Sequence, residues 1–69
     1  MSMWSPQQLR KIGNGHCWQA VIYAERAQRA NLAGHNGRAE MCDTFAISHR
    51  FYARDLYERA LDIETRPAA

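Results

Sequence analysis

Three histidines and two cysteines are the side chains of this 69-residue chain that could bind a metal ion: His16, Cys17, His35, Cys42 and His49. Cys42 and His49 would lie about 10 Å apart on a helix, whereas bonds from zinc to its ligands are about 2.1–2.3 Å long. His16 and Cys17 are adjacent in sequence, so they do not face one another on a helix. We therefore expect no metal and no cofactor, and we expect both cysteines to be buried as small apolar side chains.

Nucleophilic catalysis would require a cysteine or serine beside a base within a cleft. His49 could approach Cys17 across two packed helices, but a seam between two helices offers no pocket for a substrate. The acidic pair Glu58 and Asp62 has the spacing of surface charges on a helix. We therefore expect no catalytic residues and predict that the protein is not an enzyme.

The length and composition indicate one small soluble domain that spans residues 1–69. The net charge of +2, from nine basic and seven acidic residues, is weak for a nucleic-acid binder. Eight of the nine basic residues are arginine, a pattern typical either of protein interfaces or of a GC-rich genome. The N-terminus does not resemble a secretory signal, and the apolar run 20–24 is too short to cross a bilayer. We therefore expect a cytoplasmic protein with no membrane partner.

The positions of proline and glycine predict an all-α fold, a two-helix antiparallel hairpin. Ser5, Pro6 and Gln8 have the types of a helix N-cap, first residue and capping box. This start predicts helix one over about 6–32, either continuous or kinked or broken at the glycine-rich residues 13–15. The turn is expected at 33–37, with Gly34 in the left-handed conformation and Asn36 or Gly37 as the next N-cap. Helix two is expected over about 38–65.

The apolar spacing gives each helix one packing face. Helix one presents Leu9, Ile12, His16, Ala20, Tyr23, Ala27 and Ala30, and helix two presents Cys42, Phe45, His49, Tyr52, Leu56 and Ile63, with Ala53 and Ala60 widening the face. A hairpin centred near residue 35 pairs residue i with about 70 minus i. Small side chains should then meet bulky ones: Ala20, Ala24 and Ala27 against Phe45, His49 and Tyr52. The same register places Arg26 and Arg29 near Asp43 and Glu40. Three further pairs of opposite charge have i,i+4 spacing along helix two: Arg54 and Glu58, Asp55 and Arg59, Asp62 and Arg66.

Two helices bury one seam, and apolar residues remain on the outer faces. Such residues would promote aggregation if left exposed, so we expect a homodimer in the form of a four-helix bundle. The residues assigned to the dimer interface are Trp18, Ile22, Tyr52 and Leu56. A second patch combines an aromatic ring with flanking arginines, a composition typical of binding hot spots. The residues assigned to a protein partner are Ile47, Arg50, Phe51, Arg54 and Glu58.

Three other functions fit parts of the pattern. If residues 13–15 break helix one, three helices could form a helix-turn-helix DNA-binding regulator, although Glu40 and Asp43 would then repel phosphate. A tetratricopeptide-like turn is present, but such arrays need about three units. A structural phage or prophage component is the third alternative. A DNA binder would be distinguished by an affinity that falls steeply with salt.

The whole chain resembles small phage-encoded quorum-sensing anti-activators. The similarity rests on the start MSMWSPQQL, the turn LAGHNGRAE and the second helix FAISHRFYARDLYERAL. It implies a dimeric helical hairpin, located in the cytoplasm of the host cell. It also implies an inhibitor that binds the DNA-binding domain of a LuxR-type regulator and keeps it off its promoters. The type IV pilus assembly ATPase is a second implied target, through which superinfection would be excluded.

Overall fold

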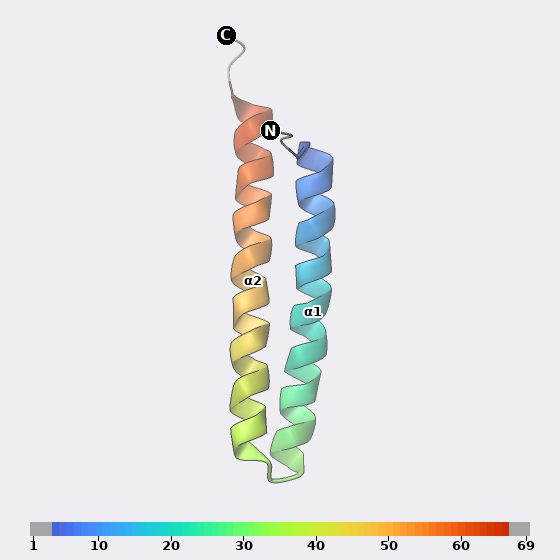
Figure 1. The fold of residues 1–69 in the computed structure, drawn as a ribbon, viewed down its shortest axis with the longest axis vertical. Helices are drawn as coiled ribbons and strands as arrows, with labels where there is room; N and C mark the ends of the chain where they lie inside the picture. The colour runs from blue at the N-terminus through green and yellow to red at the C-terminus, as the bar shows by residue number, and fades with distance from the viewer. Residues whose placement is uncertain (1–3, 67–69) are drawn as a thin grey trace.

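The computed structural model describes residues 4–66, which form two long helices packed side by side (Figure 1). Helix α1 comprises Pro6–Leu32 and helix α2 comprises Asn36–Thr65. They run antiparallel and are joined by one short turn, so the predicted hairpin is confirmed. Residues 4–66 contain no strand. Neither helix of this part of the chain is long and apolar enough to cross a membrane.

The helix ends follow the sequence signals at the start of α1 and depart from them at the start of α2. Ser5 and Gln8 form the predicted capping box, with Pro6 as the first helical residue. Gly34 adopts a φ of 79°, the left-handed conformation expected of it. The prediction that Asn36 or Gly37 caps α2 is wrong, because His35 is the N-cap and makes no side-chain capping bond. Helix α2 therefore starts two residues earlier than expected.

Small residues at seven-residue intervals form the contact line between the helices, which we call the alanine seam. Its members in α2 are Ala39, Ala46, Ala53 and Ala60, and its members in α1 are Gly13, Ala20 and Ala27. Each alanine of the seam is at most 2% exposed. A seven-residue repeat keeps one side of a helix against its partner over many turns. The expected packing of small against bulky side chains is therefore wrong, since small residues line both helices.

Large apolar side chains complete the core only at the open end of the hairpin. Leu9, Leu56 and Ala60 form a buried cluster, against which Ile12 and Ile63 pack. An ion pair between Arg10 and Glu64 joins the two helices beside this cluster, and Arg10 lowers the pKa of the Glu64 carboxyl group through their hydrogen bond. The predicted packing face of α2 is thus only partly correct: Leu56 is buried, whereas Phe45 and Tyr52 are 44% and 58% exposed.

Contacts across the hairpin agree with the predicted register. Tyr57 lies against Gly13, and Tyr23 lies between Phe45 and His49, on either side of the expected position 47. Helix α1 continues through residues 13–15 without a break. The three predicted i,i+4 ion pairs are present, at 2.9–3.1 Å. Ion pairs from Arg26 or Arg29 to Asp43 or Glu40 are absent among residues 4–66.

The absence of a side chain at Gly13 leaves room for the Tyr57 ring. Alanine substitutions at Gly13 and Gly15 should therefore have opposite effects on stability. A Cβ atom at Gly13 would lie 2.8 Å from Cε1 of Tyr57, whereas one at Gly15 would have no atom within 4 Å. We expect Gly15→Ala to stabilise the hairpin by about 1 kcal/mol, the gain in helix propensity. Gly13→Ala should lose that gain and destabilise the fold by about 1–2 kcal/mol, because the ring must move.

Urea unfolding followed by circular dichroism measures both effects. Gly15→Ala is the matched control, since it changes the same residue type in the same helix. Equal stabilisation by both substitutions would show that Tyr57 moves freely, and it would contradict the close contact at Gly13.

Candidate interaction surface

Small and large apolar side chains lie in the opposite places to those of an ordinary globular protein. The buried positions are mostly alanine, whereas large apolar residues lie outside. Those that are 44–83% exposed are Trp4, Trp18, Val21, Leu32, Met41, Phe45, Ile47, Phe51, Tyr52 and Leu61. Single exposed apolar residues are common, but contiguous exposed patches mark interaction sites. The arrangement of these residues into patches therefore identifies the candidate surface.

One side of the hairpin carries a shallow groove of about 330 Å³, which we call the α2 groove. Its lining residues are Cys17, Arg50, Ala53, Arg54, Tyr57, Glu58 and Leu61. Three of the five residues predicted to bind a partner, Arg50, Arg54 and Glu58, are thus brought together. Arg54 Nε donates to Glu58 Oε1 at 3.0 Å, so this ion pair fixes one edge of the groove. Arg50 makes no such pair within residues 4–66.

A short chain of hydrogen bonds forms the floor of the α2 groove. Tyr57 Oη donates to Asn14 Oδ1 at 2.5 Å and lies 3.4 Å from Cys17 Sγ. Either atom can be the donor between Tyr57 Oη and Cys17 Sγ. Their hydrogen bond raises the pKa of the Tyr57 phenol. Sequence reasoning did not identify this network, although the register places Tyr57 opposite residue 13.

A second hollow adjoins the groove on the α1 side. It is lined by Asn14, Cys17, Trp18 and Val21, and it shares Cys17 with the α2 groove. Trp18, which is 70% exposed, therefore lies beside the residues assigned to a partner. The prediction placed Trp18 in a separate dimer interface. The two hollows together form one surface from parts of both helices.

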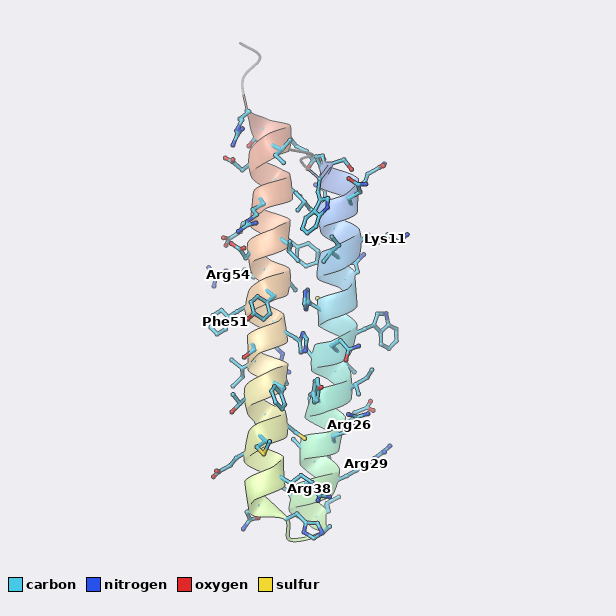
Figure 2. All side chains as sticks on the ribbon, in the orientation of Figure 1. Lys11, Arg26, Arg29, Arg38, Phe51 and Arg54 are labelled. Carbon is cyan, nitrogen blue, oxygen red and sulfur yellow. The ribbon has the colours of Figure 1, made fainter. Side chains whose placement is uncertain are left out.

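The two remaining residues assigned to a partner extend this surface around α2. Phe51 is 63% exposed and Ile47 is 49% exposed. Phe51 and Arg54 project from the same outer side of α2, away from α1 (Figure 2). The surface thus combines an exposed aromatic ring with arginine and glutamate side chains.

The other three residues assigned to the dimer interface do not lie together. Leu56 is 8% exposed and belongs to the hairpin's own core, so its side chain is not available to a second copy. Ile22 is partly buried. Tyr52 packs on His16 and His49, with ring centroids 5.4 Å and 6.5 Å away. Among the four, Trp18 and Tyr52 are the two exposed side chains that a second copy could cover.

A row of five rings occupies the side of the seam that contains Tyr52. The rings alternate between the helices in the order Phe45, Tyr23, His49, His16 and Tyr52, with neighbouring centroids 5.1–5.6 Å apart. His16 Nδ1 lies 2.8 Å from His49 Nδ1. One of these two nitrogens must carry the proton and the other must accept it. The pair is a polar contact between two partly buried side chains in an otherwise apolar seam.

The potential metal ligands include one close pair, His16 and His49. Residues 4–66 contain no group of three or more histidine, cysteine or acidic side chains close enough to share an ion. Both cysteines are free thiols. The expectation that they are buried is wrong: Cys17 is exposed at the groove, and Cys42 is partly exposed.

Comparison of the chain with family models, curated proteins and solved structures gave no match. The function proposed below therefore rests on the residues, on their geometry and on the resemblance seen in the sequence.

The histidine pair predicts a specific coupling between two substitutions. We expect His16→Phe and His49→Phe each to destabilise the hairpin, because each leaves one polar nitrogen without its partner. The double variant should be about 1 kcal/mol more stable than the sum of the two single losses predicts, since two phenyl rings restore an apolar contact. A double-mutant cycle from urea unfolding measures this coupling. The control cycle combines His16→Phe with His35→Phe. His35 lies at the turn, far from His16 along the hairpin, so the two effects should be additive.

Proposed function

We propose that this hairpin is a protein-interaction module that inhibits a partner by covering part of the partner's surface. One observation carries the proposal: alanines fill the seam, while ten large apolar side chains of residues 4–66 remain exposed. A buried alanine removes about one methyl group from water, about 0.8 kcal/mol, whereas a large apolar side chain contributes about 1.5–3 kcal/mol. The exposed part of these large side chains is therefore available to other molecules.

The first expected occupant of this surface is a second copy of the chain. Chains of this size rarely stabilise a fold alone, and antiparallel hairpins associate readily into four-helix bundles. The exposed rings of Trp18 and Tyr52 provide apolar area on opposite sides of the seam. We propose that the side with Tyr52 dimerises, which would leave the side with Trp18 and the α2 groove open.

The second occupant is a protein target at the α2 groove and the adjoining Phe51. Aromatic and arginine side chains at the centre of a patch are the residue types that dominate binding energies. Phe51 and Ile47 supply apolar anchoring. Glu58 supplies a carboxylate at the groove's edge, which suits a target whose surface is basic because it normally contacts DNA.

The similarity to phage anti-activators makes this target specific. On that basis we propose that the protein blocks DNA binding by a LuxR-type quorum-sensing regulator. We further propose that it inhibits the type IV pilus assembly ATPase, whose acidic sites would meet Arg50 rather than Glu58. The chain would then act in the cytoplasm of the infected cell.

The alternative, a helix-turn-helix DNA-binding regulator, has less support. That motif uses a third helix to hold its recognition helix. Residues 4–66 form two helices. A third helix would require a break in α1 at residues 13–15, and α1 is continuous there. The first turns of α2 also carry Glu40 and leave it exposed.

The dimer is tested by the mass of the chain in solution. We expect light scattering to give twice the 8.0 kDa mass of one chain. Tyr52→Ala should shift the equilibrium toward the monomer, and Trp18→Ala should leave it unchanged. Leu32→Ala is the control, because Leu32 is 83% exposed near the turn and lies outside both candidate sides. A monomer with a cooperative melt would refute the dimer.

The target site is tested by binding of the chain to the DNA-binding domain of a LuxR-type regulator. We expect Phe51→Ala to weaken binding at least about tenfold, as for other aromatic hot spots. Glu58→Arg should weaken it further, because it reverses the charge that faces a basic surface. Release of labelled promoter DNA from the regulator gives the functional readout.

Two controls keep this test informative. Helicity and dimerisation are measured for every variant, and Glu25→Arg makes the same charge change at an exposed site outside the groove. Unchanged binding by both Phe51→Ala and Glu58→Arg would remove the assignment of this surface. Direct, steeply salt-dependent binding of the chain to DNA would favour the DNA-binding alternative instead.

A further inference from the structure

The turn end of the hairpin carries a basic hollow, well away from the α2 groove. The hollow has a volume of about 450 Å³ and is lined by Arg26, Arg29, Ala30, Ala33, His35, Arg38 and Cys42. Figure 2 shows its three arginines near the turn, whereas Lys11 lies toward the other end of α1. We call this site the arginine hollow.

The charges of the arginine hollow are not balanced within the hairpin. Four of the eight arginines in the chain form ion pairs with carboxylates, namely Arg10, Arg54, Arg59 and Arg66. Three of the other four line this hollow, and no acidic residue lines it. The carboxylates expected nearby, Glu40 and Asp43, form no ion pair within residues 4–66. Gathering three positive charges without a counter-ion is unfavourable, and a bound anion would relieve that cost.

The folding of the hairpin explains these arginines only in part. Arg29 lies in the last turn of α1, where a cation stabilises the negative end of the helix dipole. Arg26 places its Cζ atom 5.6 Å from the centre of the Tyr23 ring, a cation–π contact. Arg38 lies in the first turn of α2, where the same dipole disfavours a cation. Arg38 therefore destabilises α2, and no ion pair within residues 4–66 offsets this effect.

We propose that the arginine hollow binds a phosphate group. A guanidinium group donates two parallel hydrogen bonds to a phosphate, and a terminal phosphate presents three acceptor oxygens and close to two negative charges. Three arginines around one hollow match that number of acceptors. The volume lies within the range of small-ligand sites. His35, which caps α2 without a side-chain bond, also lines the hollow and has a ring N–H that can donate to an anion.

A small phosphate ligand fits this site better than a nucleic acid does. Proteins that follow a nucleic-acid backbone carry basic residues along a stripe or a whole face. The three arginines of the hollow lie at one end of the hairpin, and Lys11 and Arg54 lie apart from them (Figure 2). The proposed ligand is therefore a phosphate group that is either free or carried by a small molecule. This site does not depend on the function proposed above.

Titration of the full chain with pyrophosphate, followed by NMR at constant ionic strength, tests the site. We expect saturable shifts of backbone amides between residues 26 and 42, with a dissociation constant on the order of 1 mM. Arg38→Gln should weaken binding by about tenfold, because one charge-assisted pair is lost. Arg38→Lys should have a smaller effect, since it keeps the charge and loses the planar fork. Inorganic phosphate and a nucleoside diphosphate, titrated in parallel, distinguish a free from a carried phosphate group.

Arg50→Gln is the matched control, because Arg50 is the one remaining arginine without an ion pair in residues 4–66 and lies outside the hollow. It should leave the affinity for pyrophosphate unchanged, and circular dichroism should show that all variants fold. Shifts that sodium chloride reproduces, or an equal loss in Arg50→Gln, would overturn the site. Equal or tighter binding of a polyglutamate peptide or of a short DNA duplex would also overturn it, in favour of a protein or nucleic-acid partner.

Discussion

Alanine side chains spaced seven residues apart let the two helices of this protein approach closely, and the rest of the surface is arranged around that contact. Ala20 and Ala27 of α1 and Ala46 and Ala53 of α2 are at most 2% exposed. At Gly13 the approach is so close that even a methyl group would meet the Tyr57 ring at 2.8 Å. A seam of small residues leaves no room for larger ones, which are displaced to its two sides.

The two sides of the seam have different chemistry as a result. On one side, five rings from both helices lie in a row around the hydrogen bond between His16 and His49. On the other side, Tyr57 reaches across to Asn14 and Cys17 and forms the floor of the α2 groove. Both sides expose apolar surface, because the helices have no further layer to cover it. The proposed binding of a partner would complete this burial, and this links the packing of the seam to the proposed role in inhibition.

The charges are also divided along the length of the hairpin. Toward the open end, Arg10 pairs with Glu64, and the i,i+4 pairs neutralise the outer face of α2. At the turn, three arginines line one hollow without a carboxylate. Exposed ion pairs contribute little to stability, so this division matters more for what the two ends bind than for the fold. The groove offers an apolar surface edged by charge, and the turn offers a site for an anion.

The sequence by itself determined the helices, their antiparallel arrangement and their register, because capping residues, Gly34 and apolar spacing act locally. It also identified Arg50, Arg54 and Glu58 as neighbours, since residues four apart share a helix face. It did not determine which stripe of α2 faces α1: the aromatic and the alanine stripes are adjacent, and the sequence favoured the larger side chains. Only the tertiary structure decided between them, because the close approach of two backbones depends on both helices at once. The same contact placed Leu56 in the core, exposed Cys17 and brought Trp18 beside the groove.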